Sequence, residues 1–184
     1  VYECAKLKKL SLYEVDIPSL EISGFSDLKC LEINDMYNLE TLSVGSHEKL
    51  SALWMFGCHK LETIDLSGAK SIKTLDLMEN ESLKEVMFGE RNGKLETIQL
   101  NGLRSLCEMD VSCLESLKSL NLTDVALVNL DVSKNAALEQ FCAEGVHLDT
   151  LDLSNNPKIT YLINDKDSFR TILLPEDNRV DMIR

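Results

Sequence analysis

The sequence has little of what several functional classes require. Aromatic residues make up 5% of the 184 residues, and only 8 glycines and 3 prolines are present, which excludes collagen-like and low-complexity chains. No apolar run approaches the roughly 18 residues of a membrane helix. Acidic residues outnumber basic ones by 31 to 19, so the formal net charge is −12, and no basic stripe compensates for it. Because such a surface repels phosphate backbones, we expect no nucleic-acid partner. The lack of a long apolar run predicts that the chain has no membrane span.

Motifs of catalysis and metal binding are missing as well. No P-loop, dinucleotide fingerprint, G-x-S-x-G or H-E-x-x-H occurs. The cysteines form no C-x-x-C pair and no zinc-ligand spacing, so we expect free thiols at Cys4, Cys30, Cys58, Cys107, Cys113 and Cys142. The histidines are predicted to lie in separate turns, at His47, His59 and His147. We therefore predict a protein that is not an enzyme, with no cofactor and no metal site.

Leucine, in contrast, is abundant, with 32 residues, and it recurs in a pattern. The unit L-x-x-L-x-L fits the chain sixteen times at spacings of 10 to 12 residues, and 47 of the 48 key positions are apolar, with Asn164 the exception. The eight odd units start at Leu7, Leu28, Leu50, Ile72, Leu95, Leu117, Leu138 and Ile159. The eight even units start at Ile17, Leu39, Leu61, Leu83, Leu106, Leu127, Leu148 and Phe169.

The unit also predicts its own geometry. Apolar residues alternate within L-x-L, which is the period of a β-strand, and Ser, Gly, Asn or Asp follow each strand, as in a tight turn. Eleven residues leave no room for a helix, so two units make one coil of 21–22 residues. Stacked coils then share a continuous apolar core, which is the arrangement of a solenoid.

Three segments resemble the leucine-rich repeat family, namely LDVSKNAAL (130–138), LDTLDLSNNPKITYL (148–162) and IKTLDL (72–77). The nested spacing is similar to the short repeats of Bacteroidetes surface proteins, and LSALWMFGCHKL (50–61) resembles repeats of plant immune receptors. The resemblance implies a right-handed solenoid of about eight coils, with a parallel sheet on the concave side and short extended or turn segments on the convex side. It implies one domain over residues 1–184, with repeats at 7–174 and a polar C-terminal tail at 175–184.

The family usually places asparagine at the ninth position of the unit, where its amide bonds backbone groups between coils. Only Asn80, Asn135 and Asn156 hold this place, with Cys58 as a common substitute. We therefore expect an incomplete asparagine ladder.

Outward positions of the even units are acidic in five of eight cases. They are Glu21, Ser43, Asp65, Met87, Asp110, Asp131, Asp152 and Leu173. One interpretation is an acidic binding strip or a row of calcium ligands. Calcium needs six or more converging oxygens, which one Asp per coil does not supply. The favoured interpretation is that each Asp bonds nearby backbone or the Ser two residues later.

Outward positions of the odd units include the chain's one tryptophan. Trp54, Phe56 and Met78 are predicted to cluster on one face, surrounded by Glu32, Asp76 and Gln99. An exposed apolar cluster with a polar rim is typical of an interface hot spot. The alternative is that these side chains pack under a loop or a neighbouring domain. Our hypothesis is that the odd units line the concave face and that these six residues bind a ligand.

The sequence thus predicts a recognition module for a protein or surface-glycan ligand, because a repeat array leaves its outward residues free to bind. By resemblance, we expect an exported bacterial protein, extracellular or at the cell surface, with its signal peptide removed or the chain a fragment. The alternatives are a parallel β-helix enzyme acting on polysaccharide, a structural spacer in a larger surface protein, and a fragment of an intracellular immune receptor.

Overall fold

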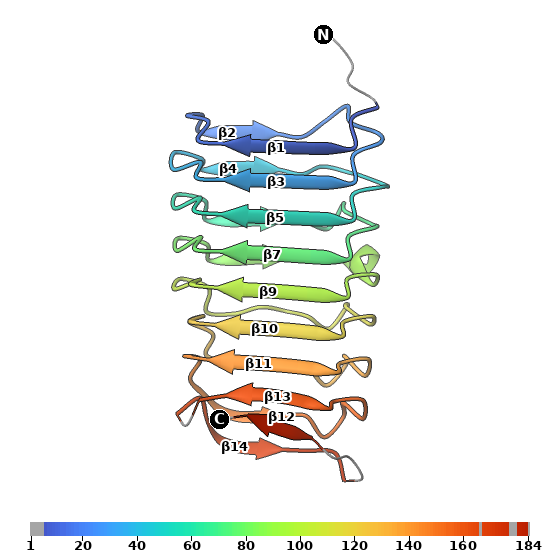
Figure 1. Cartoon of the computed structure of the whole chain (residues 1–184), viewed down its shortest axis with the longest axis vertical. Coiled ribbons are helices and arrows are strands. Elements are labelled where there is room, and N and C mark those ends of the chain that lie inside the picture. The colour runs from blue at the N-terminus through green and yellow to red at the C-terminus, as the bar shows by residue number, and fades with distance from the viewer. Residues whose placement is uncertain (1–5, 166, 177–179, 184) are drawn as a thin grey trace.

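The computed structural model describes residues 6–165, 167–176 and 180–183, and these residues form a β-solenoid of about eight coils. One side is a nine-stranded parallel sheet, in which each coil adds one strand (Figure 1). We call this side the long-sheet face. In spatial order its strands are β1 (Lys9–Tyr13), β3 (Cys30–Asn34), β5 (Ala52–Phe56), β7 (Thr74–Met78), β9 (Thr97–Asn101), β10 (Ser119–Thr123), β11 (Gln140–Glu144), β13 (Tyr161–Asn164) and β15 (Asp181–Ile183).

The opposite face is built from the even units and is interrupted. Its four-stranded parallel sheet ends at β8, and a separate two-stranded sheet follows near the C-terminus. The four strands are β2 (Ser19–Glu21), β4 (Thr41–Ser43), β6 (Thr63–Asp65) and β8 (Glu85–Met87), and the pair is β12 (Leu148–Asp152) with β14 (Phe169–Leu173). A 3-10 helix, η1 (Glu90–Asn92), follows β8. The short extended segments predicted for this side thus also pair into sheets.

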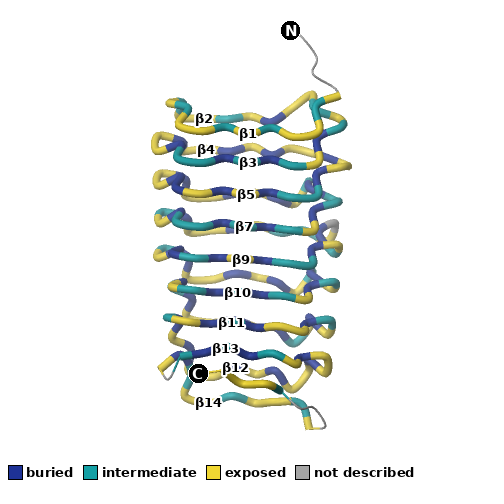
Figure 2. Tube along the Cα trace, viewed as in Figure 1, coloured by how far each residue is buried: buried dark blue, intermediate teal, exposed yellow. Residues whose placement is uncertain are grey.

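The apolar positions of the repeat face inward and form the core. In β5, for example, Leu53 and Met55 are buried, whereas Trp54 and Phe56 point outward and are exposed. The same alternation recurs from coil to coil, so that buried segments repeat at matching places along the stack (Figure 2). The core predicted from the unit is therefore confirmed, and Asn164 is buried at its C-terminal end.

Turns after the strands of the long-sheet face share one backbone conformation. In seven successive coils, the residue directly after the strand has a positive φ between 52° and 69°, at Glu14, Asp35, Gly57, Glu79, Gly102, Asp124 and Gly145. A left-handed residue lets the chain turn sharply, and glycine adopts it without steric cost. At Gly102 a side chain would also collide with a neighbour, since an added Cβ would lie 2.7 Å from Glu79 Oε1.

Buried polar side chains join neighbouring coils on the opposite face, and their number exceeds the prediction. Asn135 Nδ2 donates hydrogen bonds to Val111 O and Leu114 O, at 2.9 and 3.0 Å, and Asn156 bonds the preceding coil in the same way. Two further residues join coils without having been predicted to do so. His47, expected in a turn, is buried, and its Nε2 donates to Ile22 O at 3.1 Å. Asn92 Nδ2 donates to Leu66 O at 2.9 Å.

The C-terminal tail contributes one further strand. The sequence predicts a polar tail outside the repeats at 175–184, yet Asp181–Ile183 form β15, which pairs with β13 in parallel. The long-sheet face therefore continues beyond the last L-x-x-L-x-L unit.

Candidate functional site

The six predicted ligand-binding residues lie together on the long-sheet face. Strands β3, β5, β7 and β9 are paired in register, so that Glu32, Trp54, Asp76 and Gln99 occupy directly opposite positions in that order. Two residues further along, Asn34, Phe56, Met78 and Asn101 form a second row. We call the surface made of Glu32, Trp54, Phe56, Asp76, Met78 and Gln99 the Trp54 surface.

The centre of the Trp54 surface is apolar and open. Trp54 is 37% exposed and Phe56 42% exposed, while Met78 beside Phe56 is half-buried. Parallel pairing places adjacent strands about 4.8 Å apart, so the three side chains form a continuous patch. Trp54 and Phe56 are exposed, so no loop among the described residues covers them, in contrast to the alternative stated above.

Glu32, at one side of this patch, already has protein partners. Its Oε2 accepts a hydrogen bond from Ser11 Oγ at 2.7 Å and forms an ion pair with Lys9 Nζ at 3.0 Å. The hydrogen bonds from Ser11, Lys9 and Tyr13 lower the pKa of Glu32 from 4.5 to about 2. Glu32 is thus held ionised and fixed in place.

Asp76, at the other side, is in the opposite situation. Its Oδ1 is covered and has no hydrogen-bond partner within the described part of the chain, and burial raises the pKa of its carboxyl group. A buried acceptor without a donor is costly, and burial disfavours the ionised form of the carboxyl group. Sequence reasoning placed Asp76 on this surface but gave no sign of its unmet acceptor.

Acidic residues of the even units behave as the favoured interpretation expects. The backbone N–H of the serine two residues later donates to the Asp Oδ1 in each case, at 2.8–2.9 Å, for Asp65–Ser67, Asp110–Ser112, Asp131–Ser133 and Asp152–Ser154. No group of three or more potential metal ligands occurs among the described residues.

Five of the six cysteines are free thiols, as predicted, and Cys4 lies outside the described residues. Cys58 is buried, which raises the pKa of its thiol to about 11. The neighbouring His59 is exposed and stacks on Tyr37, with ring centroids 5.7 Å apart. The two side chains are therefore engaged with different surroundings and not with each other.

Comparison with known proteins gives a limited result. No family model and no curated protein sequence matches the chain. A similar solved structure is described as the functional domain of InlJ from Listeria monocytogenes, which includes a cysteine ladder. It is 17% identical, with a TM-score of 0.43, and the match covers 97% of this chain and 50% of that one. This chain thus spans half the length of the structure it matches.

No helix of the described residues is long and apolar enough to cross a membrane.

Proposed function

We propose that this chain is a non-enzymatic recognition module that binds a partner protein through the Trp54 surface. One observation carries the proposal: the only tryptophan of the sequence is exposed, with Phe56 and Met78 beside it, on strands that pair in register. Large aromatic side chains are costly to leave in water and dominate the energetics of interfaces.

The rim of the surface supports a polar and positively charged complement. Glu32 is ionised, and Asp76 presents a carboxylate whose covered oxygen lacks a donor. A partner that places an arginine or lysine over Trp54 would gain a cation–π contact and would also face Asp76. This pairing would increase specificity, because a partner without the cation would cover the charge of Asp76 without an opposite charge beside it.

Localisation and domain organisation belong to the same proposal. The resemblance to leucine-rich repeats of surface proteins supports an exported or surface-bound recognition module, with residues 7–174 as the repeat array. A spacer of the same fold would bind nothing through this surface, and that difference is what the experiment measures.

The test uses site-specific photocrosslinking followed by binding measurements. A benzophenone amino acid at position 56 is compared with one at Val128, which is exposed on the opposite face. A protein crosslinked only from position 56 is then purified and titrated against the chain, with the emission of Trp54 as the signal. Phe56→Ala is expected to weaken binding at least ten-fold, and Val128→Ala less than two-fold.

Trp54→Ala, assayed by calorimetry because it removes the fluorophore, is expected to cause the largest loss of affinity. Unchanged affinity of both Trp54→Ala and Phe56→Ala would reject the proposal. Saturable binding of a glycan that depends on Trp54, with no crosslinked protein, would replace the protein partner by a glycan.

A further inference from the structure

The face opposite the long-sheet face is interrupted, and this interruption is separate from the Trp54 surface. The four-stranded sheet of this opposite face stops at β8, and β12 begins only after two intervening coils. Between them, the even units at 106–111 and 127–132 carry no strand. The unit starting at Leu83 is the one with 12 residues, and its extra residue lies between β8 and β9, which still pairs with β7 in the frame of the repeat.

The interruption leaves an open edge on β8. Glu85 N–H donates to Glu62 O at 3.3 Å, and Met87 O accepts from Leu66 N–H at 2.9 Å, so both residues use their backbone groups toward β6. Alternate residues of a parallel strand bond to opposite neighbours, and Val86 therefore directs its N–H and C=O toward the segment 106–111. Within the described residues, no backbone hydrogen bond joins that segment to residues 84–89.

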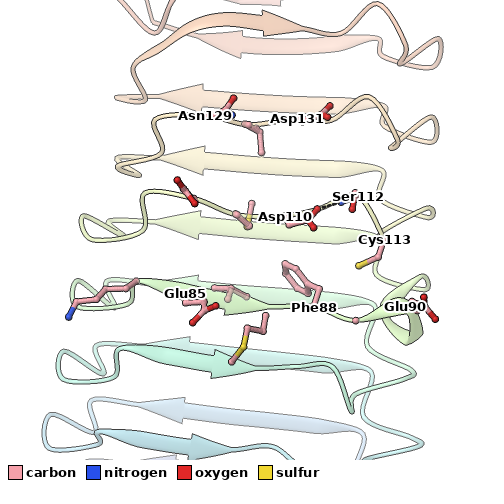
Figure 3. A pocket seen from close by; sticks show the side chains of 15 residues that line it. Glu85, Phe88, Glu90, Asp110, Ser112, Cys113, Asn129 and Asp131 are labelled. Atoms are coloured by element: carbon pink, nitrogen blue, oxygen red, sulfur yellow. Dashed lines mark hydrogen bonds between the residues drawn. The ribbon is translucent and has the colours of Figure 1, made fainter.

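A groove of about 980 Å³ lies along this edge, open to solvent, and spans three coils (Figure 3). Its apolar part is formed by Val86, Met87, Phe88, Met109 and Leu130. Met87 is exposed and Phe88 is half-buried, in contrast to the fully buried Leu66 at the position of Phe88 one coil earlier. The groove therefore offers apolar contact area beside unpaired backbone groups.

Charge around the groove is predominantly negative. Its lining includes the five acidic residues Glu85, Glu90, Glu108, Asp110 and Asp131. Lys84 is the one described cation of the lining, and its Nζ pairs with Glu62 at 2.8 Å. Hydrogen bonds from Ser112 and Ser133 lower the pKa of Asp110 and Asp131, so both remain ionised at neutral pH.

We propose that this groove binds an extended, lysine- or arginine-rich peptide segment of a partner protein. An extended peptide supplies the backbone donors and acceptors that Val86 lacks, its apolar side chains cover Met87 and Phe88, and its cations face Glu85 and Glu108. A second copy of this chain fits less well, because its net charge of −12 brings like charge to an acidic groove. The groove and the Trp54 surface lie on opposite faces, so this proposal does not depend on the proposed function.

The probe is a fluorescein-labelled peptide of about eight residues in which lysine and valine alternate, with binding to the full chain followed by fluorescence polarisation. We expect saturable binding that weakens as salt is raised. The double variant Glu85→Lys and Glu108→Lys is expected to weaken binding at least ten-fold. The matched control, Glu21→Lys and Glu40→Lys, makes the same change in net charge at exposed positions outside the groove and is expected to change binding less than two-fold.

A second peptide, N-methylated at alternate residues, tests the backbone contacts, and is expected to bind at least five-fold more weakly. The urea midpoint of unfolding shows whether charge reversal disturbs folding. If it does, the double variant Glu85→Gln and Glu108→Gln replaces the charge-reversal variant. Trp54→Ala is expected to leave peptide binding unchanged, which separates this result from the test of the Trp54 surface.

Three outcomes would overturn the proposal. Equal loss of binding in the control pair would indicate general attraction to an acidic protein. Equal binding of the N-methylated peptide would exclude backbone pairing at the edge of β8, and equal binding of a glutamate–valine peptide would exclude recognition of cations by the acidic groove. A concentration-dependent dimer abolished by Glu85→Lys and Glu108→Lys would make a second copy of the chain the occupant.

Discussion

The two faces of this solenoid are built from the same six-residue unit, yet one is a continuous sheet and the other is interrupted. Odd units contribute eight strands in succession to the long-sheet face, although the last three odd units have 10 residues in place of 11. Even units lose their pairing after β8, where one unit has a single extra residue. The comparison teaches that the same apolar spacing can build the core in every coil without pairing the strands on both faces.

The reason lies in the turn after each strand. On the long-sheet face, seven coils turn through a left-handed residue directly after the strand, which sets the same exit direction in every coil. On the opposite face, Gly24 and Gly45 are the only described residues with a positive φ, and side chains such as His47, Asn92 and Asn135 bond one coil to the next. Four predictions test this difference, in order of decreasing effect.

The largest effect is expected where the two faces meet. Phe141 of β11 is fully buried, and its ring lies 6.4 Å from that of Phe169 of β14, across the core. Phe141→Ala should lower the free energy of unfolding by about 3–5 kcal/mol, through lost burial and the cavity left behind. Phe56→Ala, on an exposed residue, should change it by about 0.5 kcal/mol or less in the same urea titration. Similar values for both would contradict the described core.

The next effect concerns the polar contacts of the opposite face. His47→Ala removes a buried donor and leaves Ile22 O unpaired, so unfolding should become easier by about 2–3 kcal/mol. His47→Asn restores an amide donor at the ninth position of the unit and should recover at least half of this loss, as judged by chemical denaturation. No recovery would mean that the ring contributes by packing and not by its hydrogen bond.

Backbone geometry should give a smaller effect on the long-sheet face. Gly102 has a φ of +69° and lies against Glu79, so Gly102→Ala should cost about 1–2 kcal/mol. Gly93, in the turn after η1, has a φ of −56° and no neighbour closer than 3.8 Å to an added Cβ. Gly93→Ala should therefore be neutral or slightly stabilising in thermal unfolding. Equal destabilisation at both positions would refute the role given to the left-handed turn.

The smallest effect is expected from pH. The folded-state pKa of Glu32, about 2, lies below the ordinary 4.5, so its contribution to stability is present above pH 4.5 and is lost as pH falls toward 2. Glu32→Gln should cost about 0.2–1 kcal/mol at pH 7, because surface pairs contribute little, and almost nothing at pH 2. A difference that persists at pH 2 would show that the ion pair is not its cause.

Sequence reasoning predicted the fold well because the repeat records the core directly. The starts of the odd units placed the strands of the long-sheet face, and the alternation within β5 placed Trp54 and Phe56 outward. Surface chemistry was harder to predict. The spacing did not predict the role of Asn92, because the extra residue moves it from the ninth to the tenth position of its unit. It did not predict the role of His47, because a histidine holds the ninth position in place of asparagine.

Other features could not be predicted because they depend on what is not paired. Asp76 belongs to the same row as Trp54, and only the structure shows that one of its oxygens is covered without a donor among the described residues. The groove beside β8 likewise results from missing hydrogen bonds between described coils, which no residue pattern encodes. The pairing of Asp181–Ile183 with β13 has no counterpart in the repeat, since that segment lacks its spacing.

The interrupted sheet also has a mechanical consequence. A stack held by sheets on both sides resists bending in either direction, whereas a stack held on one side has a compliant point. Here the long-sheet face is continuous past the even units at 106–111 and 127–132, while the opposite face carries no strand in these units. We therefore expect the molecule to bend at these two coils about its intact sheet, and the bend to set the angle between the two halves of the long-sheet face.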